Sequence, residues 1–308
     1  MFRLLNRNRI LTRWRGPVFS QGSTDRDLCG GLCLGFSDMT KIRAPAVAGR
    51  FYPADPRELR AAVRAYVDAV RSGSGEGECL GVLPKAIIAP HAGYTYSGAT
   101  AGAVYALLSP LRGVVERVVL LGPAHRVALS GFATSDAEAF ATPLGSVPID
   151  VDAIRGLSDL SYVSSFDPAH AEEHCLEVHL PFLQEVLGAF RLVPFVVGEA
   201  NAGQVGEVLE RLWGGRETLI VVSSDLSHFH DYAAAQTLDR GTAHRIETLT
   251  PVDEQGACGR RPINGLLLVA RRYGLTAKVV DVRNSGDADG GRDRVVGYGG
   301  FVFTASGE

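Results

Sequence analysis

Residues Lys85–Gly98 read KAIIAPHAGYTYSG, and this stretch decides the fold. The apolar run Ala86–Ala89 is too short for a helix and is stopped by Pro90, so it predicts a buried strand. Small and apolar residues follow at helical spacing between Ser97 and Leu107, which predicts a helix. His91 therefore begins the loop at the strand's carboxyl end, where open α/β sheets bind ligands.

Apolar runs of strand length alternate with amphipathic stretches through the rest of the chain. This alternation predicts an α/β fold with a largely parallel or mixed sheet and helices on both faces. Turn residues in Ala139–Asp150 predict a hairpin, which leaves room for a few antiparallel strands. In Glu172–Gly188 leucines recur at helical spacing, and Pro181 either kinks this helix or starts a new turn. The other expected strands are Arg117–Gly122, Leu192–Val197, Thr218–Val222, Ala277–Val282 and Val295–Phe303; the other expected helices begin at Asp55-Pro56 and cover Val205–Trp213, Ala233–Thr248 and Pro262–Tyr273.

The composition of the 308 residues excludes several classes of protein. A hydrophobic content of 46% allows a large core, and a net charge of −3 gives no reason to expect a nucleic-acid partner. No apolar run approaches the length that spans a bilayer, so no membrane segment is expected. Five cysteines, an odd number and mostly far apart, argue against a disulfide framework and favour a cytoplasmic protein.

The N-terminal 40 residues differ from the remainder because five arginines precede the first acidic residue. They lack a secretory apolar core, so we interpret residues 1–40 as disordered or as a mis-called extension, with the true start at Met39. Cys29 and Cys33 have no further partners at metal-ligand spacing. Residues 41–308 are then predicted to form a single α/β domain.

Five polar side chains follow predicted strands or precede a predicted helix. They are His91, His125, Asp225, His228 and Cys258. Parallel strands bring their carboxyl ends to one edge of a sheet, so these distant residues are expected to converge there. Taken alone, each histidine is more often a hydrogen-bonded structural residue than a ligand, and the hypothesis depends on their shared position.

Imidazole and thiolate together suit iron, copper or zinc. Cys258 lies just before a predicted helix and beside Arg260 and Arg261, and both features favour the thiolate. The alternative, a small buried hydrophobic residue, is equally compatible with the sequence.

Two further groups of polar residues could take part in a site. Asp225 could fix the tautomer of His228, which could then move a proton; alternatively Asp225 caps a helix and His228 is exposed. His174 and Glu177 lie three residues apart on the predicted helical face, with His179 close by, and could bind a metal or a substrate group, although their order is not that of a zinc protease. The remaining histidines, His170, His230 and His244, are expected at the surface.

Seven segments together resemble the Memo family, which is protein B of the AmmeMemoRadiSam group of bacteria and archaea. They run in order between about Arg43 and Thr304 and leave only the N-terminal tail uncovered. The segments are GRFYP at Gly49, PHAGYTYSG at Pro90, GPAH at Gly122, EHCLEVHLPFL at Glu173, SSDLSH at Ser223, CGRRPI at Cys258 and VGYG at Val296.

The resemblance implies a fold like that of class III extradiol dioxygenases and a metal site formed by His91, His125 and Cys258. Asp225 and His228 match further site residues, and His228 falls on the acid/base position of the dioxygenases. The implied cofactor is one metal ion, with Fe(II) or copper expected ahead of zinc. Cys258 replaces the carboxylate of ring-cleaving enzymes, so catechol cleavage does not transfer directly.

Three functions compete on these grounds. The first is a metal-binding redox protein with an unknown substrate; if it is an enzyme, it is expected to be a dioxygenase-like oxidoreductase. The second is a binding protein that uses the same cleft for a small molecule or a peptide, or that joins radical-SAM and AMMECR-like partner proteins, as the resemblance implies. The third is a zinc hydrolase with an open ligand position.

Overall fold

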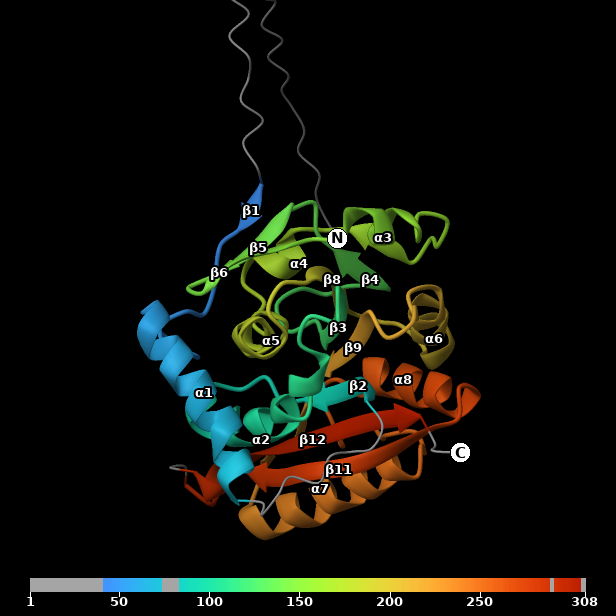
Figure 1. Ribbon diagram of the computed structural model, residues 1–308. Coiled ribbons are helices and arrows are strands. Elements are labelled where there is room, and N and C mark those ends of the chain that lie inside the picture. Colours follow the sequence, from blue (N-terminus) through green and yellow to red (C-terminus); the bar gives the residue numbers. More distant parts are fainter. Residues whose placement is uncertain (1–40, 74–82, 289–290, 306–308) are drawn as a thin grey trace, which may run out of the picture. The chain divides into compact units, whose positions relative to one another are not determined.

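The computed structural model describes residues 41–73, 83–288 and 291–305, and Figure 1 shows the arrangement of their helices and strands. The predictions for residues 1–40, including Cys29 and Cys33, lie outside these residues. No helix within the described ranges combines the length and the apolar character needed to cross a membrane.

The main sheet has a parallel centre and antiparallel flanks. Its strand order is β10-β12-β2-β9-β3-β8-β4-β7, with β11 on the other edge of β12. Neighbours from β2 to β8 pair in parallel, whereas β12 is antiparallel to β2, β10 and β11. The strands are β2 (Pro84–Ala89), β3 (Arg117–Pro123), β4 (Phe132–Thr134), β7 (Val163–Ser165), β8 (Arg191–Val197), β9 (Thr218–Ser223), β10 (Asp225–His230), β11 (Leu275–Asn284) and β12 (Val295–Ala305).

A second sheet is small and contains the predicted hairpin. Its strands are β1 (Ile42–Arg43), β5 (Ala139–Thr142) and β6 (Gly145–Pro148), in the order β1-β5-β6. The helices are α1 (Pro56–Gly73), α2 (Tyr94–Ala106), α3 (Val151–Arg155), α4 (Pro168–Ala171), α5 (Leu180–Leu187), α6 (Ala202–Arg211), α7 (Tyr232–Glu247) and α8 (Arg260–Arg272), with 3₁₀ turns η1 (Ser109–Leu111), η2 (Glu177–His179) and η3 (Ser285–Asp287).

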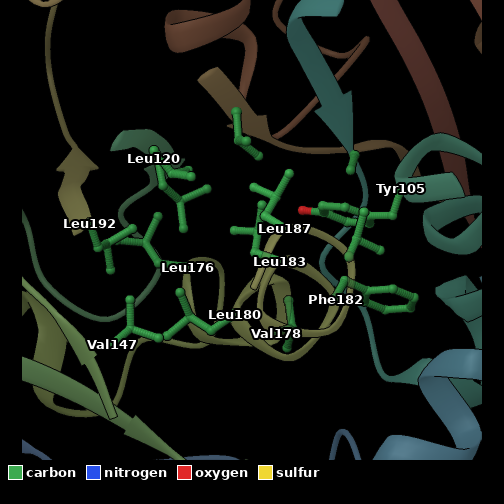
Figure 2. Packing of buried hydrophobic residues seen from close by; sticks show 14 of the residues in the cluster. Tyr105, Leu120, Val147, Leu176, Val178, Leu180, Phe182, Leu183, Leu187 and Leu192 are labelled. Atoms are coloured by element: carbon green, nitrogen blue, oxygen red, sulfur yellow. The ribbon is translucent and has the colours of Figure 1, made fainter. Parts of the chain in front are cut away.

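Alternate residues of the central strands point to opposite faces of the sheet, as the two-residue period of a strand requires. In β9, Leu219 and Val221 pack with α1, α2 and α5, whereas Ile220 and Val222 pack with α6, α7 and α8. Figure 2 shows Leu180, Leu183 and neighbouring residues of α5 filling the first of these two cores. The prediction of an α/β fold with a mixed sheet and helices on both faces is confirmed.

Two local predictions need correction. The chain between Glu172 and Leu176 is not helical, and α5 begins only at Leu180, with Pro181 in its first turn. Asp225 does not cap a helix, because the chain after β9 continues directly into β10, which pairs with β12. The short strands β4 and β7 were not predicted, since three-residue strands carry no readable period.

Candidate metal centre

The candidate ligands meet at the carboxyl edge of the parallel strands. His91 follows β2 by two residues, and His125 follows β3 by two residues. Cys258 lies two residues before α8, the helix that packs against the ends of β3 and β9. The parallel strands and the start of α8 therefore bring together residues as far apart in the chain as His91 and Cys258, which are separated by 167 positions.

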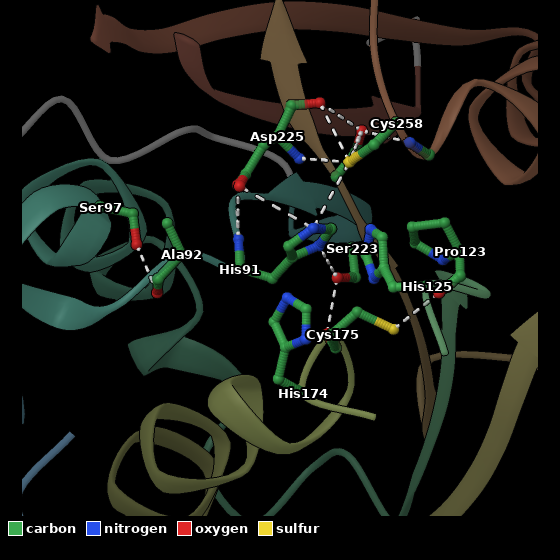
Figure 3. A network of polar contacts seen from close by, with 12 residues as sticks. His91, Ala92, Ser97, Pro123, His125, His174, Cys175, Ser223, Asp225 and Cys258 are labelled. Carbon is green, nitrogen blue, oxygen red and sulfur yellow. Dashed lines mark hydrogen bonds and ion pairs between the residues drawn. The ribbon is translucent and has the colours of Figure 1, made fainter. Parts of the chain in front are cut away.

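Three donor atoms form a compact group at this edge. A ring nitrogen of His91, a ring nitrogen of His125 and Sγ of Cys258 all lie within 4.8 Å of one another. His91 Nε2 is 3.4 Å from Cys258 Sγ, and a dashed line joins these two residues in Figure 3. Tetrahedral ligands at typical zinc–nitrogen and zinc–sulfur distances would lie about 3.5 Å apart. These residues therefore fit a single first-row metal ion without rearrangement of that pair.

The tautomer of His91 is assigned by its hydrogen bonds. The Ser223 hydroxyl donates to the Cys175 carbonyl at 2.6 Å, so it must accept at its 2.6 Å contact with His91 Nδ1. Nδ1 then carries the proton and Nε2 presents a lone pair towards Cys258. Burial, together with the neighbouring histidines, lowers the pKa of His91 and keeps its ring neutral. A neutral ring with a free Nε2 is the form that binds metal.

His125 is oriented by Glu173, a buried residue that the sequence analysis missed. Oε2 of Glu173 accepts the His125 backbone N–H at 2.7 Å, and Oε1 lies 3.0 Å from His125 Nδ1. Oε1 also accepts the backbone N–H groups of His174 and Cys175. Burial raises the pKa of Glu173, but the bonds from His125 outweigh it and lower this pKa to about 2. Glu173 thus remains a carboxylate and leaves His125 Nε2 available.

A second donor group overlaps the first. His125, Glu173 and His174 also have potential ligand atoms within 4.8 Å of one another. The rings of His125 and His174 stack at 4.9 Å, and His174 also lies 4.9 Å from the ring of Phe51. Burial lowers the pKa of His174 to about 4. His174 therefore adds a neutral ring to the wall of the site.

The environment of Cys258 differs from the sequence expectation. Burial and the nearby carboxylate of Asp225 raise the pKa of its thiol to about 12. Both Arg260 and Arg261 direct their guanidinium groups to glutamates instead. The backbone N–H of Asp225 does donate to Sγ at 3.3 Å. A thiolate at this position consequently needs a bound metal to stabilise it.

Asp225 and His228 do not form the predicted pair in which one orients the other. Asp225 Oδ1 accepts the backbone N–H of His91 at 2.8 Å, and burial raises the pKa of this carboxyl to about 7. His228 is instead oriented by the carbonyl of Leu226, which lies 2.9 Å from its Nδ1. The proton on Nδ1 leaves His228 Nε2 as an acceptor, and burial lowers the pKa of the ring. His228 is half-buried.

Glu177 and His179 do not join the donor groups. The Glu177 carboxylate binds the Arg43 guanidinium at 2.7 Å and the Tyr52 hydroxyl at 2.6 Å. It also accepts the backbone N–H groups of Ala46 and Val47. Glu177 therefore fixes the chain between Arg43 and Tyr52. This segment includes Phe51, whose ring contacts His174. His179 is buried, with Nδ1 2.9 Å from the Tyr105 hydroxyl.

His170 also departs from the expectation of a surface residue. It is only 2% exposed, and its Nε2 contacts the Ala133 carbonyl at 3.0 Å. Its own carbonyl accepts from Arg43. His170 thus belongs to the packing beneath the small sheet and not to the candidate centre.

Fold and donor set together define an α/β protein with a candidate metal centre at the carboxyl edge of its sheet. A family model described as "Memo-like protein" matches residues 43–302. A MEMO1 family protein of Methanopyrus kandleri is 38% identical, over 85% of this chain and 98% of its own length. Relatives of the same name from Ignicoccus hospitalis and Aquifex aeolicus are 35% and 34% identical, over 85% of this chain and 98% and 99% of theirs. The chain belongs to the Memo family.

Proposed function

We propose that this protein binds one redox-active metal ion, Fe(II) or copper, through His91, His125 and Cys258. The observation that supports the proposal is the convergence of these donors, with both rings turned so that Nε2 is left free. Imidazole with thiolate suits iron and copper, and the mixed donor set departs from the all-oxygen sites of magnesium or calcium. Such a metal, when bound, supplies one-electron or oxygen chemistry.

The protein's own residues would orient and deprotonate a substrate. His228 accepts a proton at Nε2, because its Nδ1 proton is committed to the Leu226 carbonyl and burial keeps the ring neutral. Asp225 fixes the backbone of His91 and so positions that ring. The rings of His174 and Phe51 contact each other beside the site and add apolar surface to it. The proposed activity is therefore that of a metal-dependent oxidoreductase.

Elemental analysis of protein purified without oxygen tests the proposal. We expect iron or copper near one equivalent per chain in the wild type, and its loss in His91→Ala and Cys258→Ser. Cys175→Ser is the matched control, because this second buried thiol contacts the Pro123 carbonyl and lies outside both donor groups. Equal metal in all variants would refute the ligand set. Zinc alone, with no redox response, would favour the hydrolase.

A binding role is our second proposal, and the residue beside His228 favours it. Phe229 is 61% exposed and has φ 63°, a backbone conformation that is rare for a bulky residue. Its ring is available to a peptide or to a partner protein, such as the radical-SAM and AMMECR-like proteins. In this case metal-free protein should still bind its partner, and Phe229→Ser should weaken that binding. Unchanged binding by Phe229→Ser would exclude this surface.

A further inference from the structure

A cavity of about 240 Å³ opens directly onto the candidate metal centre. It lies between the loop that follows β3, the end of β8 and the start of α8. Two candidate ligands, His125 and Cys258, form part of its lining. Any molecule in this cavity would therefore lie beside two of the three candidate ligands.

The cavity is built into the fold. Gly198, just after β8, passes so close to the loop that a Cβ there would lie 1.9 Å from the Leu129 carbonyl oxygen. Backbone bonds from Gly198 to Gly131 and from Glu199 to Leu129 fasten the loop to β8. Such fixed walls are typical of ligand sites that are formed before the ligand arrives.

Its size suits a small molecule, and its lining offers apolar surface beside polar groups. The aliphatic side chains of Val127, Leu129, Val197 and Pro262 form much of the wall. An apolar cavity of about 150 Å³ accommodates benzene, and drug-sized ligands need about 300–1,000 Å³. A volume between these limits suits one ring or a short branched chain.

One cationic group lies on the lining. The Arg261 side chain is 29% exposed, and its Nη2 pairs at 2.5 Å with Glu199, whose side chain is 76% exposed. An ion pair with so exposed a partner is weak, so an incoming anion can replace Glu199. The planar guanidinium retains further N–H donors in the geometry that matches a carboxylate.

We propose that the cavity is the substrate site and that it binds a small apolar carboxylate, with Arg261 as the residue that determines specificity. The carboxylate pairs with Arg261, and the apolar body lies along Val127 and Pro262 towards His125. A single guanidinium balances a single negative charge, which favours a monoanion over a phosphate dianion. This inference rests on the proposed function, because it places the bound molecule against the candidate metal ligands.

Titration calorimetry on metal-free protein tests the assignment independently of the metal. The probes are benzoate, its neutral analogue benzamide, and phenyl phosphate. We expect benzoate to bind, and benzamide to bind at least about tenfold more weakly, because hydrogen bonds to charged groups are the stronger ones. Because no metal is present, failure of the metal proposal and failure of this one are distinguishable.

Neighbouring residues provide matched variants. Arg261→Gln should weaken benzoate binding by roughly ten- to a hundredfold. Arg260→Gln is the control, since this adjacent arginine pairs with Glu254 and does not line the cavity. It should bind benzoate within about twofold of wild type. Glu199→Gln should bind more tightly, because it removes the competing carboxylate.

The histidine ring signals in NMR spectra show where benzoate binds. Benzoate should shift the signal of His125, which lines the cavity, and leave that of buried His170 unchanged. No benzoate binding, equal binding of benzamide, preference for phenyl phosphate, or an Arg261→Gln variant that binds like wild type would each overturn the proposal. Tighter binding by Glu199→Gln supports it even if Arg261→Gln fails to fold.

Discussion

Replacement of Glu173 by glutamine separates the role of its charge from its shape. Three N–H donors converge on Oε1, namely His125 Nδ1 and the backbone N–H groups of His174 and Cys175, whereas Oε2 accepts the His125 backbone N–H. A glutamine must therefore place its oxygen at Oε1 and its NH₂ group opposite that remaining N–H. Two donors then face each other where the present separation is 2.7 Å.

The expected cost follows from the His125 N–H and the glutamine NH₂ group, which both lack an acceptor at this contact. A buried donor without an acceptor costs about 1–3 kcal/mol, and we expect the free energy of unfolding to fall by at least that amount. Loss of a carboxylate that orients a metal-binding histidine should weaken metal affinity by about 10–100-fold. Urea denaturation measures the first quantity, and titration against a competing chelator measures the second.

The adjacent Glu172 supplies the control for Glu173→Gln. It is exposed and shares the same chain segment, so Glu172→Gln should change stability by less than about 0.5 kcal/mol and leave metal affinity unchanged. Wild-type stability and metal affinity in Glu173→Gln would refute the reasoning. Equal effects of the two substitutions would show that net charge at the site, and not the orientation of His125, controls binding.

Three further outcomes are expected. Ser223→Ala removes the acceptor for His91 Nδ1, so metal affinity measured by chelator competition should fall by about tenfold; an unchanged affinity would contradict the assigned tautomer. Burial lowers the pKa of His170 from 6.5 to about 4, so its contribution of about 3 kcal/mol to the free energy of unfolding is present above pH 6.5 and lost as the pH falls towards 4. In urea denaturation, His170→Gln should flatten the dependence of stability on pH in this range. A pH dependence identical to that of wild type would exclude this role of His170. The Cys258 thiol must lose its proton to bind a metal, so the metal affinity should rise about tenfold per pH unit between pH 7 and 9. A metal affinity that does not change with pH would exclude thiolate ligation.

The approximate positions of the candidate ligands could be predicted from sequence because each follows from the place where a strand ends. Short apolar runs ended by proline identify β2 and β3, and these strands, parallel with β9 between them, bring His91 and His125 to the same edge of the sheet. Only the approximate place of each residue is needed for this argument. The details of rotamers and loop paths do not enter it.

The groups that orient those ligands depend on such details and could not be predicted. Glu173 lies in a non-helical turn, and an acidic residue next to a histidine in sequence does not reveal which donors its carboxylate will accept. Asp225 was expected to fix the tautomer of His228, but the Leu226 carbonyl does so. Every residue has a backbone carbonyl, so the sequence does not indicate which carbonyl a side chain will contact. Arg260 was expected to favour a thiolate, yet an exposed glutamate competes successfully for its guanidinium.

Charge balance at the centre bears on the choice of metal. The rings of His91 and His174 are held neutral, while Glu173 is held as a carboxylate beside His125. A Cys258 thiolate would add a second negative charge, so a divalent ion brings this group to neutrality and a monovalent ion leaves it negative. Buried charge is costly unless it is compensated. Fe(II) therefore balances this group when Asp225 is protonated, as its pKa of about 7 allows, whereas Cu(I) leaves one negative charge uncompensated.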